Sequence, residues 1–245
     1  MTFLTGAVIA LLALSASALN ATVPKTKGPF CIIFSGDVSG IISYETHNNE
    51  TKSYKFKVPT LTDFDGQCLK PTNGSTTESL KLRFYPNDVT PNLTAADPWT
   101  LEIVFKENAE QTNNAYAIDT YSLHAIFYDI FVNATEAEFT FNKSDAAELE
   151  WAGERTLGFK CSKTGLALTH DSVVSFEDLK VLAFAQLPKP EFPEGQGFQL
   201  CKLDIRTSDV VPIVVGACLA GLVIVVLIAY LVGRARARRQ GYASV

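Results

Sequence analysis

The segment WTLEIVF, from Trp99 to Phe105, has apolar side chains at alternate positions, which is the period of an extended β-strand. One face of such a strand is apolar and would pack into a core (Leu101, Ile103 and Phe105). The other face is more polar and suits solvent (Thr100, Glu102 and Val104). The segment therefore predicts a half-buried strand in an antiparallel sheet.

Segments with the same character recur over residues 80–187. They are LKLRF (80–84), AYAIDTYSLHAIFYDIFV (115–132, too long for one strand), EFTF (138–141), GLAL (165–168) and LKVLAFAQL (179–187). Turn sequences separate them: PTNGS (71–75), YPND (85–88) and LPKPEFPEGQG (187–197). Within residues 19–209, the body of the chain, helical character is confined to NKSDAAELEWAG (142–153). The body is thus predicted to be one mainly β domain with phenylalanine-rich inner faces.

The sequence VVPIVVGACLAGLVIVVLIAYLV, Val210 to Val232, contains no charged or amide side chain. A helix of this length spans about 34 Å, enough to cross a hydrocarbon core of about 30 Å. Four arginines follow within seven residues (Arg234, Arg236, Arg238 and Arg239). By the positive-inside rule they place the C-terminus in the cytosol.

The N-terminus carries AVIALLALSASA, Ala7 to Ala18, an apolar run that ends in an A-x-A pattern. This is typical of a signal peptide cleaved after Ala18, although no Lys or Arg precedes the run. The predicted type I protein has a signal peptide at 1–18 and a luminal or extracellular domain at 19–209. A transmembrane helix at 210–232 and a cytosolic tail at 233–245 complete it.

The predicted luminal segment is acidic. All 26 Asp and Glu residues lie in 19–209, together with 17 of the 21 Lys and Arg, because four are in the tail. The resulting charge of 17 minus 26, or −9, argues against binding of nucleic acid or of an anionic membrane through this domain.

Four of the five cysteines are in the predicted luminal segment: Cys31, Cys68, Cys161 and Cys201. An even number in an oxidising compartment predicts two disulfides, for which three pairings are possible. The absence of C-x-x-C argues against a redox or zinc site, and we expect no metal or cofactor. Cys218 lies in the middle of the predicted membrane helix, where we expect it to pack against lipid or another helix.

Six asparagines begin an N-x-S/T sequon without proline: Asn20, Asn49, Asn73, Asn92, Asn133 and Asn142. The composition of the segment predicts about two by chance, so the set indicates N-glycosylation. Asn20 would lie two residues from the new N-terminus and is the weakest candidate. Glycans at the other five sites would cover much of the domain.

The sequence lacks the common catalytic motifs, including G-x-S-x-G, H-E-x-x-H and a phosphate-binding glycine loop. The histidines His47, His124 and His170 share no spacing with a metal or nucleophile motif, and His124 is interpreted as a partly buried structural residue. We therefore predict that the protein is not an enzyme.

The last four residues, Tyr242 to Val245, fit the pattern Y-x-x-Φ, and Gly241 precedes them. An extended peptide with two side-chain anchors suits binding along the edge of a sheet with two pockets. We therefore predict a sorting signal that clathrin adaptor complexes bind.

The segment VPIVVGACLAGLVIVVLIAYLVGR (Val211 to Arg234) resembles the transmembrane signature of the lysosome-associated membrane glycoprotein (LAMP) family, and GYASV is similar to the family's terminal Gly-Tyr-x-x-Φ signal. The sequences around Cys201 (LAFAQL…GFQLCKLD) and after Cys68 (LKLRF, then LEIVF) also resemble family segments. The resemblance implies bridges Cys31–Cys68 and Cys161–Cys201 and a β-prism luminal domain made of two sheets. Well-known members have two such domains joined by a proline-rich glycosylated hinge, whereas this sequence contains one.

These features predict a single-pass glycoprotein of the lysosomal membrane, also present in late endosomes, with minor transit through the plasma membrane. Its glycan-covered domain would shield the limiting membrane from luminal hydrolases. The alternative hypothesis is a LAMP-like sorting partner or chaperone that escorts another membrane protein. Two overlapping small-x-x-x-small pairs in the helix, Gly216 with Ala220 and Ala217 with Gly221, would permit self-association, although small residues are common in membrane spans.

Overall fold

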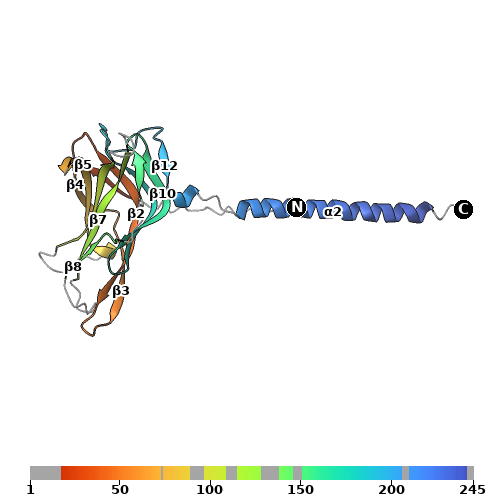
Figure 1. Ribbon diagram of the computed structural model, residues 1–245, viewed down its shortest axis with the longest axis horizontal. Coiled ribbons are helices and arrows are strands. Elements are labelled where there is room, and N and C mark those ends of the chain that lie inside the picture. The colour runs from red at the N-terminus through yellow and green to blue at the C-terminus, as the bar shows by residue number, and fades with distance from the viewer. Residues whose placement is uncertain are drawn as a thin grey trace, which may run out of the picture. The chain divides into compact units, whose positions relative to one another are not determined.

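The structure is a computed structural model, and it describes residues 18–72, 74–88, 97–108, 115–127, 138–145, 151–205 and 210–241. The chain divides into two units, Met1–Leu203 and Asp204–Val245. The first unit contains the β domain, and the second contains a long helix (Figure 1). The predicted signal peptide, apart from Ala18, lies outside the described residues.

The first sheet has six strands. Five follow the order β1 (Leu19–Val23), β2 (Ile32–Glu45), β11 (Ser172–Leu182), β10 (Gly158–Leu168) and β12 (Phe198–Leu200). The sixth, β3 (Thr51–Lys57), pairs with the second half of β2, whose first half pairs with β1. Neighbouring strands are antiparallel except β10 and β12, which are parallel.

The second sheet has the same plan. Its strand order is β4 (Asp63–Thr72), β5 (Ser75–Phe84), β6 (Trp99–Asn108), β7 (Ala115–Ile126) and β8 (Glu138–Asn142). The short strand β9 (Ala152–Glu154) pairs with the first half of β7, and β8 pairs with its second half. A 3-10 helix, η1 (Pro86–Asp88), follows β5. Each sheet thus has a long strand that pairs with two shorter strands on one edge.

The two sheets enclose one hydrophobic core to which both contribute (Figure 1). The core is rich in aromatic side chains that contact one another. Trp151 makes an edge contact with Phe176 at 4.7 Å between ring centroids, and Trp99 contacts Tyr54, Phe56 and Phe84. Such pairs add specific attraction to the burial of apolar area. The predicted mainly β fold with phenylalanine-rich inner faces is confirmed.

The alternation predicted for Trp99 to Phe105 is confirmed in β6, where Leu101, Ile103 and Phe105 are fully buried. The strands β1, β2 and β3 were not predicted. The inner face of β2 includes Gly36 and Gly40, which weaken its apolar pattern. Gly40 is needed there, because a Cβ atom would approach the Phe56 ring at 2.4 Å.

The predicted helical character of residues 142–153 is wrong at both ends. Asn142 is the last residue of β8 and pairs with Ser122, and Ala152–Glu154 forms β9. Residues 146–150 lie outside the described part of the chain. Pairing with β7 at both ends outweighs the helix propensity of this sequence, as tertiary contacts often do.

The C-terminal unit contains α1 (Lys202–Ile205, which begins in the first unit) and α2 (Val210–Gly241). Residues Val214–Arg236 of α2 are long and apolar enough to cross a membrane, with a mean hydropathy of 2.8. The helix extends nine residues beyond the predicted end of the membrane span at Val232, because Arg, Ala and Gln are strong helix formers.

Candidate functional sites

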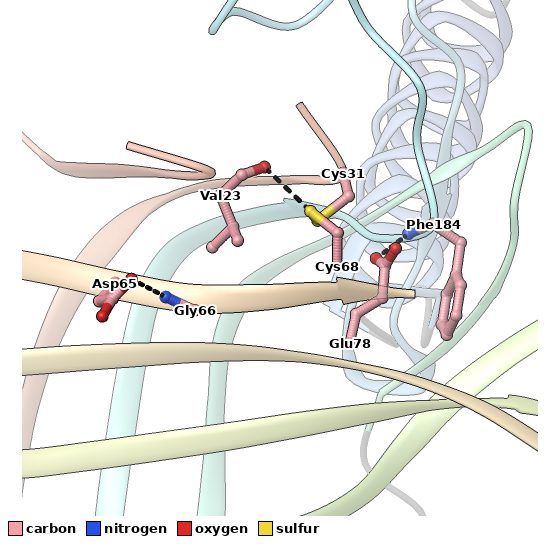
Figure 2. Close-up of a disulfide and its surroundings, with 7 residues drawn as sticks. All are labelled: Val23, Cys31, Asp65, Gly66, Cys68, Glu78 and Phe184. Carbon is pink, nitrogen blue, oxygen red and sulfur yellow. Dashed lines mark hydrogen bonds between the residues drawn. A yellow bond between two sulfur atoms is a disulfide. The ribbon is translucent and has the colours of Figure 1, made fainter. Parts of the chain in front are cut away.

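The two disulfides have the pairing that the family resemblance implies, Cys31–Cys68 and Cys161–Cys201. Cys31 lies directly before β2 of the first sheet, and Cys68 lies in β4 of the second, so this bridge joins the two sheets (Figure 2). The two cysteines are separated by 37 residues in the sequence, which sets the length of the loop that the bridge closes. In the chain-entropy account, closing such a loop destabilises the unfolded chain by about 4 kcal/mol.

The second disulfide lies within the first sheet. Cys161 is in β10, and Cys201 follows β12 and directly precedes α1. The Cys201 N–H also donates a hydrogen bond to the Lys160 carbonyl at 2.9 Å. Since α1 leads to the membrane helix, this bridge holds the point at which the chain leaves the β domain.

A buried acid, Glu78, lies beside the Cys31–Cys68 bridge (Figure 2). Glu78 is 1% exposed, and its Oε2 accepts a hydrogen bond of 2.6 Å from the Phe184 N–H. Its Oε1 is buried and has no hydrogen-bond partner within normal distance and angle in the described part of the chain. The carboxyl group thus connects β5 to the segment after β11 through Oε2, whereas Oε1 has no such hydrogen bond.

Burial raises the pKa of Glu78 to about 7, because desolvation disfavours the carboxylate. The backbone amides of Phe184 and Leu69 and the charge of Arg155 oppose this rise but do not cancel it. Arg155 itself is paired with Glu107, with 2.6 Å between Nη2 and Oε1. The sequence motifs did not indicate Glu78 as a functional residue, although it alternates in phase with Leu80 and Leu82, which are buried.

Among the residues that the structure describes, two groups of side chains have the spacing of metal ligands: Cys31, Cys68 and Glu78, and Cys161, Cys201 and Asp204. In both groups the sulfur atoms belong to a disulfide. Since zinc binds thiolates and not disulfide sulfurs, neither group suits a thiolate metal site.

The structure describes three of the six sequons, and Asn20, Asn49 and Asn142 are all exposed. Asn49 lies in the turn between β2 and β3, and Asn142 ends β8. Exposure is a requirement for a bulky glycan. Asn20 is in β1, where its side-chain amide donates to the Ala18 carbonyl. Asn73, Asn92 and Asn133 lie outside the described residues.

The described histidines do not come together. His47 is exposed in the β2–β3 turn, and His170 follows β10 with its ring against Phe141. His124 is half-buried on β7, where its Nδ1 is 3.2 Å from the Thr140 hydroxyl. This environment agrees with a structural role for His124.

A groove of about 520 Å³ lies on the outer face of the second sheet. It is lined by β6 and β7 on one side and by the end of β8 with the following residues on the other (Glu102, Val104, Thr120, Tyr121, Ser122 and residues 142–145). We call it the β6–β8 groove. A second hollow of about 280 Å³ on the same face shares Glu102 and Val104 with it.

In the membrane helix the side chains described, residues 214–236, are exposed, as suits contact with lipid. Cys218 is a free, exposed thiol. Gly216, Ala217, Ala220 and Gly221 also have exposed positions, and self-association through them stays a prediction. Gly241 ends α2, and the predicted anchors Tyr242 and Val245 lie outside the described residues.

Comparisons with known proteins give consistent matches. Residues 211–243 match the family described as lysosome-associated membrane glycoprotein 2, transmembrane segment. Lysosome-associated membrane glycoprotein 1 of Gallus gallus is 35% identical over 107 residues, which are 43% of this chain and 24% of the relative. Its Bos taurus counterpart is 27% identical over 220 residues, 88% of this chain and 46% of the relative. The chain therefore spans less than half the length of these relatives.

Two solved structures resemble the β domain. The membrane-proximal domain of mouse lysosome-associated membrane protein 1 matches with a TM-score of 0.55 at 16% identity, over 77% of this chain and 98% of that domain. The membrane-distal domain of mouse lysosome-associated membrane protein 2 matches with a TM-score of 0.52 at 20% identity, over 76% and 98%. At these identities the likeness establishes the fold.

Proposed function

This chain belongs to the lysosome-associated membrane glycoprotein family, and from that premise we propose that it shields the limiting membrane of lysosomes from luminal hydrolases. The protein would be a single-pass membrane glycoprotein with the β domain in the lumen. Late endosomes and, in passing, the plasma membrane would lie on its route. Clathrin adaptor complexes would bind the tail through Tyr242 and Val245 and direct the protein to its destination.

The observation that carries this proposal is the combination of an apolar membrane helix with a β domain whose described sequons face solvent. A disulfide joins the sheets, and the core is continuous across them, so few backbone segments would open to a protease. Glycans at exposed sites would add a layer that hydrolases must cross before they reach the membrane.

The shielding proposal is tested by removing the five sequons through Asn→Gln substitution at positions 49, 73, 92, 133 and 142. An epitope inserted between His47 and Asn48, in an exposed turn, would leave both ends of the chain unchanged. Pulse–chase measurement should give a shorter lysosomal half-life for the variant, restored by inhibitors of lysosomal proteases. Asn48→Gln, an exposed asparagine outside any sequon, is the matched control.

Imaging with a lysosomal marker separates the two parts of the proposal. The proposed lysosomal location is contradicted if the unmodified protein accumulates in another compartment. The proposed shielding role is contradicted if the sequon variant reaches lysosomes and has the same half-life there as the unmodified protein.

A further inference from the structure

Asn142 is a rigid attachment point. Its N–H donates to the Thr169 hydroxyl (3.2 Å), and its carbonyl accepts from the Thr169 N–H (2.8 Å). The next N–H, of Lys143, donates to the Tyr121 carbonyl at 3.0 Å. In β8 the side chains of Phe139 and Phe141 point inward, so Asn142 points to the outer face of the second sheet. A sugar on its Nδ2 is therefore attached to a residue whose backbone is held in place.

That position is on the rim of the β6–β8 groove. Asn142 lies directly opposite Ser122 of β7, which lies opposite Glu102 of β6, so the three side chains form one row across the face. Directly opposed side chains in antiparallel strands are about 5 Å apart at Cβ. A sugar attached to the first member of the row is thus within reach of the other two.

The lining of the groove suits a saccharide. Ser122 and Thr120 supply hydroxyls, Glu102 supplies acceptors, and all of these are suited to the hydroxyl and acetamido groups of N-acetylglucosamine. Val104 lies beside Thr120 and offers an apolar surface to the C–H groups of a pyranose ring. Specific sites commonly combine such an apolar surface with a few placed polar groups.

We propose that the first two N-acetylglucosamine residues of an N-glycan on Asn142 lie in the β6–β8 groove, against Ser122, Glu102 and Val104. The groove is thereby a saccharide-binding site whose occupant is covalently tethered to its rim. The proposal rests on the luminal location in the proposed function, since glycans are added only there.

Asn49 provides a comparison within the same chain. It lies in the turn between β2 and β3, where residues 45 and 47–53 are all exposed, and it lines neither the β6–β8 groove nor the second hollow. A glycan on Asn49 has only solvent around its first sugars. The two sites therefore differ in the protection of the Asn–sugar bond.

The test is release of glycans by peptide N-glycosidase from the folded, full-length protein in mild detergent. Reaction in ¹⁸O-labelled water marks each released asparagine, and peptide mass mapping gives a rate for each site. If the enzyme acts only when the sugars have left the groove, release at Asn142 should be at least about tenfold slower than at Asn49. After denaturation the two rates should be similar.

A substitution in the groove separates binding from simple crowding by the protein. Ser122→Tyr fills the groove beside Asn142 and should expel the sugars, bringing the Asn142 rate towards that of Asn49. Thr100 of β6 also lies on the outer face of the second sheet but outside the groove, so Thr100→Tyr should change neither rate. Tyrosine suits a strand, so both variants should fold.

Equal release at Asn49 and Asn142, or no effect of Ser122→Tyr, overturns the proposal. An unmodified Asn142 beside a glycosylated Asn49 also overturns it. If every sequon is unmodified, the luminal location and with it the proposed function fail instead.

Discussion

Glu78 places a buried carboxyl group at the contact between the two sheets. Its neighbours are the Cys31–Cys68 bridge, the Phe184 amide, and Arg155 with its partner Glu107. Water does not solvate the carboxylate there, and the single strong hydrogen bond does not replace it. The protonated acid therefore fits this position better than the anion.

The consequence for stability follows from the pKa of Glu78, about 7 in the folded protein and about 4.5 for an ordinary glutamate. Below about pH 4.5 the group is protonated in both states, so its burial carries no charge penalty. As the pH rises towards 7 the unfolded chain loses the proton first, and the free energy of unfolding falls, by about 3 kcal/mol at most. The domain should thus be most stable under acidic conditions with respect to this group.

We predict that Glu78→Gln raises the melting temperature at pH 7.5 and flattens its dependence on pH between 5 and 7.5. Glutamine has the same shape, keeps an oxygen for the Phe184 N–H and cannot ionise. Differential scanning calorimetry of the full-length protein across this range gives the result. Glu102→Gln, on the outer face, should retain the slope of the unmodified protein. A slope unaffected by Glu78→Gln would show that other groups cause the dependence.

At the scale of single elements, the sequence predicted strands best where large apolar residues alternate with polar ones, as in β6. It failed for β2, whose inner face uses glycine to admit the Phe56 ring. It also failed at Asn142 and at Ala152–Gly153, the two ends of the predicted helical segment, where pairing with β7 favours extended structure. The β6–β8 groove could not be predicted either, because it depends on the register that places Asn142 opposite Ser122.

The sequence pattern also did not predict the short edge strand β12. Phe198–Leu200 is only three residues long and pairs with β10 alone, so its own hydrogen bonds hold it weakly. The Cys161–Cys201 bridge fixes its end, directly before the exposed Lys202. We infer that this bridge, more than the strand pairing, keeps the end of the domain ordered.

We predict that replacing both Cys161 and Cys201 with serine exposes the chain at Lys202 to trypsin. Cleavage there would separate the β domain from the membrane helix. The rate of cleavage would be measured from a time course on a denaturing gel. If β12 opens locally, the rate should rise by about tenfold or more. The double replacement of Cys31 and Cys68, which removes the bridge between the sheets, is the comparison. Equal acceleration in both variants would indicate global unfolding and contradict a local role.

At the scale of the whole molecule, the β domain and the segment with the membrane helix are separate units, and the predicted tail follows the membrane span within the second unit. Its backbone is helical to Gly241, seven residues after Arg234, which corresponds to about 10 Å along the helix axis. An extended chain would reach more than twice as far. A helical tail therefore keeps the predicted signal close to the membrane surface, where a membrane-bound adaptor could meet it.

If adaptors bind the tail through two side-chain anchors, Tyr242 and Val245 must matter far more than the arginines. The tyrosine ring would fill one pocket while its hydroxyl finds a polar partner, as a buried tyrosine requires.

We predict that Tyr242→Ala moves the protein to the plasma membrane, measured by surface biotinylation, with unchanged folding and glycosylation. Tyr242→Phe should be partly defective, because it keeps the ring and loses the hydroxyl. Replacing Arg236 and Arg238 with glutamine should leave the destination unchanged, since two arginines still orient the helix. Should Tyr242→Ala still concentrate in lysosomes, the signal would have to lie in the β domain or in the membrane helix.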